Sequence, residues 1–578
     1  MATLSPRWVL AETGTAVAEA ASTLAGEFAI SPAVARVLLR RGFEGREQLA
    51  AYLDPNLDAL HPTGLLKGLP EGVARIRQAI ADKEKILLYG DYDVDGTSSI
   101  VILKTILDLL GADVSAFVPH RILDGYGMKA DRIEQAAAEG VRLIVSVDTG
   151  IRAGEVVGHA SRLGMDTIVT DHHLPEAEIP PAAAVLNPNQ PGCQYPNKNL
   201  CGAGVAFKLA QGLLEATEMP VARQRRLLES LLKMAALATV ADIVPLTGEN
   251  RAMVKLGLAG MAEVKNPGLR ALLDVSGIKA GTVPTARQVG FQIGPRINAA
   301  GRMSSASEVL DLFFTQDETT ARRIAGLLDE LNRERQETEQ QMREGIFRLL
   351  EEDQELEQQL GLVLFGEDWH LGVAGIVAGR IAERERKPTF VLTQQEKDGE
   401  VVVKGSGRSI PGFHLLDALE SMSELFDQFG GHEQAAGVTL RRDNVALFRE
   451  RFAQYAGERL DTESRRPVIE IDEVVSASEV HAGLYEDLQK MAPFGYGNPP
   501  PVLALLGLEV AAPPYVMKGK HIKLTVRQGG KLLSLKGWSV PQDWFGLCAG
   551  DKVDAAFQLE HDSYDGWSPI LKDLRRAH

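Results

Sequence analysis

The chain has 578 residues, of which 45% are hydrophobic and 24% charged, a composition typical of a globular protein. A chain of this length is too long for one core, and roughly three or four domains are expected. The formal net charge of −16 argues against a protein that coats nucleic acid by bulk electrostatics, but it does not exclude a local basic groove on an acidic body.

The N-terminal sequence "MATLSPRWVL" lacks the basic and apolar regions of a signal peptide, and no apolar run reaches the roughly 20 residues of a membrane span. We therefore expect a cytoplasmic protein that is not bound to a membrane. Cys193, Cys201 and Cys548 lack CxxC spacing, so they suggest neither a disulfide framework nor a structural zinc site.

Residues 1–80 show helix-like apolar spacing and no pattern that points to a chemistry. From Lys85, short apolar runs alternate with helical stretches; these runs are "KILLYG", "VSAFVP", "RLIVSVD" and "TIVTD". Buried strands separated by helices predict a parallel, doubly wound sheet. Residues 203–331 are predicted to be mostly helical.

The highly charged stretch 327–360 predicts one long, solvated helix with a narrow apolar face. A rigid spacer between two lobes is favoured over a coiled-coil dimer. A second, smaller α/β pattern follows this helix. The last part of the chain, with its short strands and turns, indicates an all-β barrel or sandwich, for which an OB-fold is one candidate.

Acidic and imidazole side chains follow three of the predicted strands. Asp91, Asp93 and Asp95 come after "ILLYG", Asp148 after "LIVSV", and the sequence Asp-His-His (171–173) after "TIVT". In a doubly wound sheet the functional crevice lies outside the carboxyl ends of the strands. A single Asp in such a place is commonly a helix cap, for which Asp95 or Thr97 is suitable, but capping does not explain all three strands together.

Clustered carboxylates repel one another and take up protons unless a cation compensates them. Oxygen-rich ligation with one or two imidazoles suits Mn²⁺ or Mg²⁺. The number of candidate ligands exceeds the needs of one ion, so two bridged ions are expected. Such a pair activates water and clamps a phosphoryl group. The cluster therefore predicts phosphoester hydrolysis.

The segments "DYDVDG", "SVDTG", "TDHH" and "ATVADIVPL" resemble the four ordered motifs of the DHH phosphoesterase superfamily. The resemblance implies a catalytic set of Asp171, His172 and His173, in which Asp171 and His173 are each a ligand, a support for a ligand, or the acid to the leaving oxygen. It also implies a set of metal ligands, which comprises Asp93, Asp95, Asp148, His172 and Asp242, with Asp91 as a further candidate.

The second lobe contains "FGGHEQAAG" (429–437), which is similar to a signature of the DHHA1 domain and implies substrate contacts by Gly430, Gly431 and His432. The segment "KGSGRS" (404–409) offers Ser406 and Arg408, which could hold a terminal phosphate by charge-assisted hydrogen bonds. An ordinary turn with an exposed Arg is an equal alternative for this segment.

Two further segments and the C-terminal β region look like the RecJ family of single-strand-specific exonucleases. "VPHRILDGYG" carries Arg121 and Tyr126, and "PRINAAGRM" carries a further set of substrate-binding candidates, Arg296, Asn298 and Arg302. The resemblance implies 5′→3′ degradation of single-stranded DNA to mononucleotides in recombination and DNA repair. It also implies single-strand-binding protein and a RecQ-type helicase as partners of a monomeric enzyme.

The expected architecture is therefore α/β, with a doubly wound parallel-sheet DHH domain, a connecting helix, a smaller α/β DHHA1 domain and a C-terminal all-β OB-like domain. The corresponding boundaries are 1–326, 327–360, 361–462 and 463–578. In the OB-like domain, groups suitable for base stacking and backbone contacts are supplied by Tyr515, Lys518, Lys520, His521, Lys523 and Trp538, although ordinary core aromatic side chains and solvated lysines are the favoured alternative.

Two rival functions stay open. A DHH phosphodiesterase for short oligonucleotides or cyclic dinucleotides would share the chemistry but not the substrate, and the β domain and Arg-rich segments argue against it. A non-catalytic replication or repair scaffold, like the Cdc45 relatives of this superfamily, would lack metal ligands, which are all present here. The residues alone decide neither the polarity of degradation nor a preference for DNA over RNA.

Overall fold

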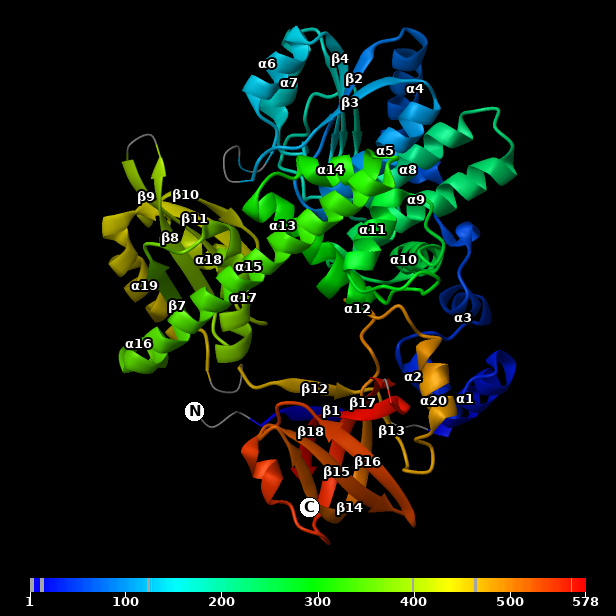
Figure 1. Cartoon of the computed structure of the whole chain (residues 1–578), viewed down its shortest axis with the longest axis vertical. Helices are drawn as coiled ribbons and strands as arrows, with labels where there is room; N and C mark the ends of the chain where they lie inside the picture. Colours follow the sequence, from blue (N-terminus) through cyan, green and yellow to red (C-terminus); the bar gives the residue numbers. More distant parts are fainter. Residues whose placement is uncertain are drawn as a thin grey trace.

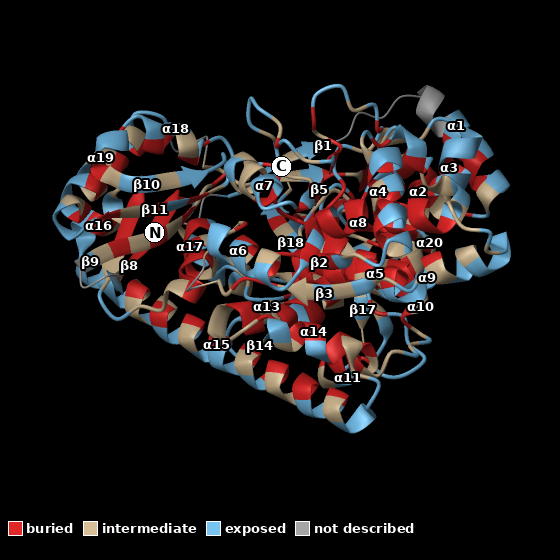
Figure 2. Ribbon diagram, turned by 90° about the horizontal axis from the view of Figure 1, so that it is seen from above, coloured by how far each residue is buried: buried red, intermediate tan, exposed pale blue. Residues whose placement is uncertain are grey.

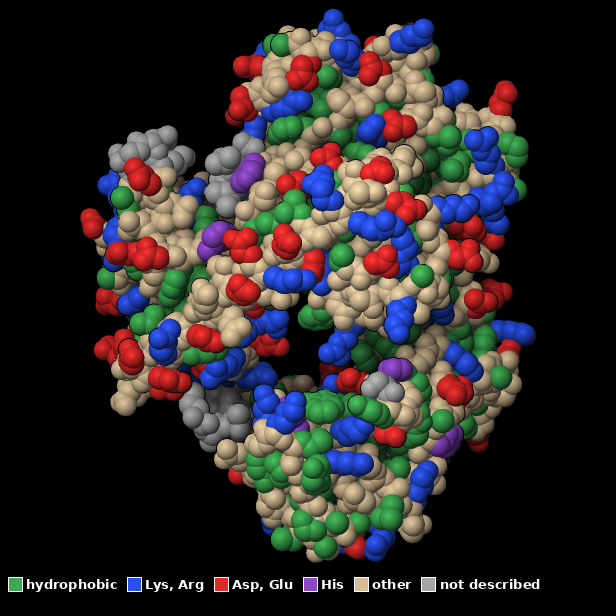
Figure 3. All heavy atoms as spheres, viewed as in Figure 1, with side chains coloured by type: hydrophobic (Ala, Val, Ile, Leu, Met, Phe, Trp, Pro, Cys, Tyr) green, Lys and Arg blue, Asp and Glu red, His purple; other side chains and the backbone are tan. Residues whose placement is uncertain are grey.

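The computed structural model describes the whole chain except residues 1–4, 11–14, 122–124, 126, 398–399, 462–464, 563 and 578. Three units surround a central opening, with an α/β unit at the top, a smaller α/β lobe at the left and a β-barrel at the bottom (Figure 1). The space-filling view shows the same opening bordered by Lys and Arg side chains (Figure 3).

The upper unit contains a parallel sheet with the strand order β3-β2-β4-β5-β6. Its strands are β2 (Lys85–Tyr89), β3 (Asp113–Phe117), β4 (Val141–Val147), β5 (Asp166–Thr170) and β6 (Ala184–Leu186). Alternate residues of β2 enter different cores: Ile86 and Leu88 pack in one, Leu87 and Tyr89 in the other. The sheet is therefore covered on both faces, as predicted.

One face is covered by α4 (Leu69–Ala81), α5 (Val94–Leu109) and α8 (Gly202–Glu215), and the other by α6 (Ala130–Ala138) and α7 (Gly154–Arg162). The predicted helical region follows as α9 (Val221–Ala241), α10 (Gly248–Gly260), α11 (Pro267–Val275), α12 (Ala286–Gln288), η3 (Val289–Ile293), α13 (Gly294–Met303) and α14 (Ser307–Phe314). Its apolar side chains extend the first of the two cores.

The long connecting helix is α15 (Glu318–Glu352), which crosses from the upper unit to the smaller lobe (Figure 1). It begins earlier than predicted because the Asp317 side chain accepts a hydrogen bond from Thr320 N and caps it. The prediction of one helix to residue 360 is wrong, because Asp353 ends α15 and caps a short helix α16 (Gln354–Gln358).

The predicted narrow apolar face of α15 is present at its two ends, where Leu328, Met342, Ile346 and Leu350 are buried. Leu349 instead is exposed. Between these ends the inner side is polar but also buried, and there Arg335 donates hydrogen bonds to Asn332 and Glu339. The expectation of a solvated spacer is therefore correct only for its outer side, which is pale blue in Figure 2.

The smaller lobe has a mixed sheet with the order β10-β11-β9-β8-β7, in which only β7 and β8 are parallel. Its strands are β7 (Leu362–Gly366), β8 (Thr389–Lys397), β9 (Glu400–Arg408), β10 (Phe426–Gly431) and β11 (Ala435–Arg441). Helix α17 (Leu371–Glu385) packs with α15 on one face, and α18 (Leu415–Glu420) and α19 (Val445–Gly457) cover the other. The second α/β pattern is confirmed.

The C-terminal strands form a sheet of order β13-β14-β15-β16-β18-β17, which the β14–β17 pairing closes into a barrel. They are β13 (Glu473–Val474), β14 (Leu503–Met517), β15 (His521–Gln528), β16 (Lys531–Gly537), β17 (Lys552–Asp562) and β18 (Gly566–Arg576), with helix α20 (Ala482–Gln489) between β13 and β14. The predicted all-β unit is therefore an OB-like barrel.

The N-terminal helices α1 (Thr15–Phe28), α2 (Pro32–Arg40) and α3 (Arg46–Leu53) contribute to the core of the barrel. Near the start of the chain, β1 (Arg7–Leu10) pairs in parallel with β12 (Val468–Ile471). Segments from the two ends of the chain thus form one packed unit. The domain boundaries expected from the sequence stay a prediction.

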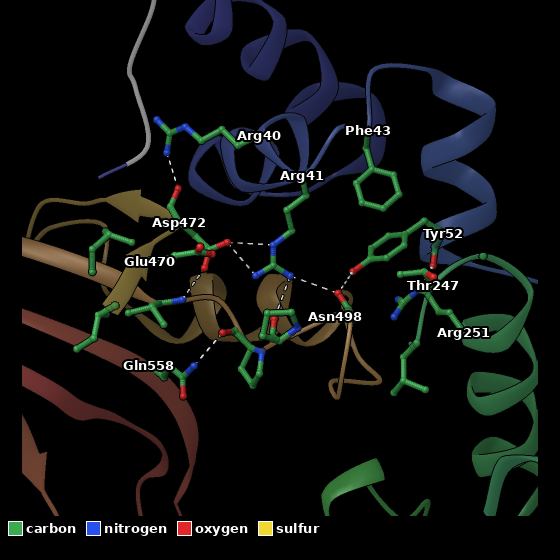
Figure 4. Close-up of a pocket in the computed structure, with 18 of the residues that line it drawn as sticks. Arg40, Arg41, Phe43, Tyr52, Thr247, Arg251, Glu470, Asp472, Asn498 and Gln558 are labelled. Atoms are coloured by element: carbon green, nitrogen blue, oxygen red, sulfur yellow. Dashed lines mark hydrogen bonds and ion pairs between the residues drawn. The ribbon is translucent and has the colours of Figure 1, made fainter. Parts of the chain in front are cut away.

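A cavity of about 1380 Å³ lies where the N-terminal helices, α10 and the barrel meet. The Arg41 guanidinium donates hydrogen bonds to Asp472 and Asn498, and the Tyr52 hydroxyl donates to Asn498 (Figure 4). The Arg251 guanidinium lies 3.7 Å from the centre of the Tyr52 ring. These polar contacts join the three parts, and the cavity does not include the acidic strand ends.

Among the described residues, no single helix has the length and apolar character to cross a membrane, and one bent pair, Glu19–Phe28 with Pro32–Arg40, meets those two criteria only when taken together.

Candidate active site

The loop after β2 holds its three aspartates in different ways. Asp93 caps α5, because its Oδ1 accepts hydrogen bonds from Asp95 N at 2.9 Å and Gly96 N at 3.0 Å. This corrects the expectation that Asp95 or Thr97 is the cap. Asp95 instead accepts from Gly202 N at 2.6 Å and Ala203 N at 2.7 Å. The backbone N–H groups at the start of α8 therefore hold the Asp95 side chain in place.

Asp148 follows β4 in a left-handed backbone conformation, with φ of 58°. A Cβ on Gly202 would lie 2.6 Å from Asp148 Cβ, so this position of α8 requires glycine. The contacts of residues 202 and 203 were not predicted from the sequence. The small residues of "CGAG" at a helix start are the signal that could have indicated a close approach.

His172 connects carboxylates from three parts of the chain. Its Nε2 lies 3.3 Å from Asp148 Oδ1, 3.7 Å from Asp95 Oδ2 and 3.8 Å from Asp242 Oδ2. Asp242 is the residue that ends α9. Three sets of possible ligand atoms lie within 4.8 Å of one another in each set: Asp148 with His172 and His173, Asp95 with His172 and Asp242, and Asp91 with Asp93 and Asp148. The structure therefore brings the predicted metal ligands together.

The electrostatics of the cluster match the requirement for a cation. Burial, together with the charge of Asp93, raises the pKa of Asp91 to about 8. Burial and the charges of Asp95 and Asp93 raise the pKa of Asp242 to about 9. Among the described residues, the buried Asp91 Oδ1 has no hydrogen-bond partner. Burial lowers the pKa of His172, which favours the neutral imidazole that a metal ion binds.

Asp171 differs from the other buried acids. It accepts hydrogen bonds from Ile151 N at 3.0 Å, His172 N at 2.7 Å and the His173 ring Nδ1 at 2.7 Å. Burial raises its pKa, but the hydrogen bond and charge of His173 outweigh burial, and the pKa is lowered overall. The same pair raises the pKa of His173 against the effect of burial. These contacts favour a support for His173 over a metal ligand.

Three guanidinium groups lie close to the acidic cluster. Arg121 follows β3, Arg302 lies at the end of α13, and Arg408 ends β9 in the other lobe. Burial and the charges of Arg121, Arg335 and Arg408 lower the pKa of Arg302 to about 9. Burial and the charge of Arg121 also lower the pKa of Arg408. Arg121 in turn acts on the pKa of Asp91, so the guanidinium groups adjoin the acidic cluster.

Ser406 lies beside Arg408 under helix α17. A Cβ on Gly375 would lie 3.0 Å from Arg408 Nη2 and 3.4 Å from Ser406 Oγ. Arg302 Nη1 donates to Gly372 O at 2.8 Å, which ties α13 of the upper unit to the first turn of α17 in the smaller lobe. We call Arg121, Arg302, Ser406 and Arg408 the anion pocket, after the substrate contact that is predicted for them.

The glycine-rich hairpin between β10 and β11 faces the same region. Burial, followed by the charge of Arg408 and a smaller effect of His173, lowers the pKa of His432. Gly431 has φ of 150°, and a Cβ there would meet the Ala435 carbonyl, so this turn requires glycine. A Cβ on Gly430 would meet no atom within 4 Å, so no close approach explains that glycine.

Two residues of the predicted substrate set make contacts within the protein. Arg296 is paired with Asp329 of α15, with Nη2 2.8 Å from Oδ1, and also donates to Gln292 O. Asn298 Oδ1 accepts from Val94 N at 3.1 Å and so supports the aspartate loop. Tyr126 lies outside the described residues.

The sequence matches three family models: DHH family, N-terminal domain, over 85–239; DHHA1 domain over 358–458; and RecJ OB domain over 471–570. The Dickeya dadantii protein named single-stranded-DNA-specific exonuclease RecJ is 37% identical over 92% of this chain and 93% of its own length. This chain belongs to the RecJ family.

Solved structures of the RecJ family have the same fold. RecJ from Thermus thermophilus in complex with Mn²⁺ superposes with a TM-score of 0.83 at 30% identity, covering 99% of this chain and 80% of that one. The Mg²⁺ complex from the same organism has a TM-score of 0.77 at 29% identity, covering 99% and 79%. The α/β, helix, α/β and barrel order is thus that of the RecJ family.

Proposed function

We propose that this protein is a metal-dependent exonuclease that degrades single-stranded DNA from the 5′ end and releases 5′-mononucleotides. One observation carries the proposal. A cluster of carboxylates and imidazoles at the carboxyl ends of three strands adjoins an anion pocket built from both lobes. The relatives carry the printed name of single-stranded-DNA-specific exonucleases.

Two ions of Mn²⁺ or Mg²⁺ would be held by the carboxylates of the cluster and by His172. Mn²⁺ and Mg²⁺ are the metals present in the two related Thermus structures. Oxygen ligands with an imidazole suit either ion. When bound, the ions supply an activated water and stabilise charge on the phosphoryl oxygens. The proposed ligands are Asp91, Asp93, Asp95, Asp148, His172 and Asp242, which all belong to the three sets of neighbouring ligand atoms.

His173 is proposed as the acid of the reaction. A water oxygen attacks the phosphorus of the second nucleotide, and the bond from that phosphorus to O3′ of the first nucleotide breaks. The leaving O3′ takes the proton that His173 holds, the attacking water releases one proton to solvent, and His173 takes up a proton from solvent again. Asp171 orients His173 and favours its protonated form before the step. One nucleotide leaves with its own 5′-phosphate, and the strand retains a new one.

The anion pocket is proposed to bind the 5′-phosphate. The guanidinium groups repel one another, as the lowered pKa values of Arg302 and Arg408 indicate, and a bound anion would offset this repulsion. A terminal phosphate carries more negative charge than an internal phosphodiester, so it should bind there more strongly. The 5′ end therefore enters first. Gly430, Gly431 and His432 of the hairpin are proposed to contact the same nucleotide from the smaller lobe.

The barrel is proposed to hold the strand farther from the active site. Tyr515 is 68% and Trp538 53% exposed, and the Trp538 ring packs edge-on against His521 at 5.2 Å. Exposed aromatic side chains with nearby lysines bind single strands irrespective of sequence. We also propose a cytoplasmic monomer that works with single-strand-binding protein and a RecQ-type helicase.

The test is release of mononucleotides from 5′- and 3′-labelled single strands, with Mn²⁺ or with a chelator, for the natural protein and Asp93→Ala. The 5′ label should appear at once as mononucleotide when the natural protein is given Mn²⁺. It should not appear with the chelator or with Asp93→Ala. Immediate release of the 3′ label contradicts the polarity. A preference for dinucleotides over long strands supports an oligonucleotide phosphodiesterase instead, and no release of either label supports a scaffold.

A further inference from the structure

Three large apolar side chains are exposed between the acidic cluster and the barrel. Ile243 is 69%, Phe291 68% and Tyr496 64% exposed. Single exposed apolar residues are common on proteins and need no explanation. These three come from distant parts of the chain, and the segments that carry them contact either the end of α9 or the loop 243–247 that follows Asp242.

Ile243 has a backbone conformation that is costly for its side-chain type. It follows the proposed metal ligand Asp242 and has φ of 57°. A β-branched residue in the left-handed region is a rare outlier, and such strain persists mostly at functional sites. The strained backbone places a large apolar side chain in solvent one residue from the acidic cluster.

Phe291 lies in the π-helical turn η3, which packs against the end of α9. A Cβ on Gly290 would lie 3.8 Å from Val240 Cγ1, and one on Gly294 would lie 3.6 Å from Ala241 Cβ. Turns of π-helix are rare and are frequent at functional sites. Phe291 is therefore a second exposed apolar side chain beside the last residues of α9.

Tyr496 approaches the same loop from the C-terminal part of the chain. Its carbonyl accepts a hydrogen bond from Leu246 N at 2.7 Å, and a Cβ on Gly497 would lie 2.9 Å from Pro245 Cβ. Next to η3, Arg287 of α12 lies 3.8 Å from Glu560 of β17. The segments that carry the three exposed side chains thus lie between the acidic cluster and the barrel, where α12 borders the central opening (Figure 1).

We propose that Ile243, Phe291 and Tyr496 form a stacking surface for the bases of the strand on the 3′ side of the bond that is cut. This inference rests on the proposed function. Every base has a flat apolar face, so such a surface accepts any sequence. In a duplex these faces are covered by neighbouring base pairs, so the surface also favours single strands.

A DNA strand is the occupant that fits the position best. The surface is continuous with the acidic cluster through Ile243 and Asp242, and Lys and Arg side chains border the opening next to it (Figure 3). A strand that is cut at the cluster must pass over its immediate surroundings. If the surface instead bound a second copy of this chain or a protein partner, it would have no reason to begin beside the proposed metal ligand Asp242.

The test uses 5′-phosphorylated single strands, each with one abasic site between the second and the eighth nucleotide. The natural protein should degrade a strand about 10-fold more slowly when the abasic site lies at the stacking surface, because one stacked base is lost. Phe291→Ala should degrade the intact strand about 10-fold more slowly than the natural protein does. Its rate should fall little further when the strand carries that abasic site. Phe291→Trp should restore both the rate and the sensitivity.

Val221→Ala is the matched control, since Val221 is also 68% exposed but lies at the opposite end of α9. It should change neither the rate nor the abasic response. The stacking surface is wrong if the abasic site and Phe291→Ala slow degradation independently, or if no abasic site slows the natural protein. It is also wrong if Phe291→Ala changes only the sedimentation of the protein, which indicates contact between copies. If the natural protein degrades no strand, the proposed function itself is wrong.

Discussion

The acidic cluster and the anion pocket both hold like charges close together, but they are built in opposite ways. The carboxylates belong to one unit and are fixed by backbone amides, as Asp93 and Asp95 show. The guanidinium groups come from both lobes, and the contact from Arg302 to Gly372 O joins those lobes. The rigid cluster is suited to the chemical step, and the two-lobed pocket to selecting the end of the strand.

The two sites also differ in how they relieve repulsion. A buried carboxyl takes up a proton, and the raised pKa values of Asp91 and Asp242 express this tendency. A guanidinium keeps its proton at neutral pH, even at a pKa of about 9. Repulsion in the acidic cluster can therefore be relieved by bound protons or by metal ions, whereas repulsion in the anion pocket can be relieved only by a bound anion. Variants of the two sites should fail in different ways.

The largest effect is expected for Asp148→Asn, which removes one charge from the acidic cluster and keeps the shape. Hydrolysis of any strand should fall by about 10³-fold, because the cluster loses a ligand that stabilises charge in the transition state. The measurement is kcat with Mn²⁺ on strands with either a 5′-phosphate or a 5′-hydroxyl. The value of kcat should fall by the same factor on both substrates.

The stability of the same variant separates chemistry from folding. Burial and the charges of its neighbouring aspartates raise the pKa of Asp148 well above its usual value, so ionised Asp148 destabilises the metal-free fold. In a chelator the melting temperature of Asp148→Asn should be higher than that of the natural protein, and Mn²⁺ should raise it less. A lower melting temperature in both conditions would instead assign Asp148 a structural role.

A smaller effect is expected for Asp171→Asn, which keeps the acidic cluster but weakens the support of His173. Since general acid catalysis contributes about 10² to 10⁴-fold, kcat should fall by about 10²-fold. The charge of Asp171 raises the pKa of His173, and an acid loses its proton as pH rises through its pKa. The alkaline fall of kcat should therefore move to lower pH. An unchanged pH profile would contradict the role of His173.

In the anion pocket, Arg408→Lys keeps the charge but removes the planar fork. Strands with a 5′-phosphate should lose about 10-fold in kcat/KM, while strands with a 5′-hydroxyl should change little. Arg441→Lys is the matched control, because its side chain is 81% exposed at the end of β11. An equal loss on both substrates would place Arg408 in the chemical step and remove the contrast between the two sites.

The sequence predicted the acidic cluster well because it follows from a rule of topology. Parallel strands deliver their carboxyl ends to one edge, so residues 91 to 95, 148 and 171 to 173 meet there wherever the sheet forms. The support from Gly202 and Ala203 could not be predicted in this way, because it depends on where α8 packs. The packing of the N-terminal helices against the barrel is likewise set by contacts between distant residues.

The anion pocket was predicted less well because a motif names residue types but not directions. Arg296 and Arg302 both lie on α13, where each residue turns about 100°, so six positions place their side chains about 120° apart around the helix axis. The two side chains therefore leave the helix in different directions. Helix periodicity alone could have shown that they need not share a role, and in the structure Arg296 forms the ion pair with Asp329.

The smallest effect is therefore expected for Arg296→Met, which keeps the apolar stem and removes the guanidinium from α13. Asp329 retains a second partner in Arg333 of its own helix, so the free energy of unfolding should fall by only about 1 to 2 kcal/mol. The ratio of kcat/KM for 5′-phosphate over 5′-hydroxyl strands should stay that of the natural protein, in contrast to Arg408→Lys. Denaturant unfolding and that ratio, measured on the same preparation, check both statements. A collapse of the ratio without a loss of stability would return Arg296 to the anion pocket and refute the assignment of α13 faces.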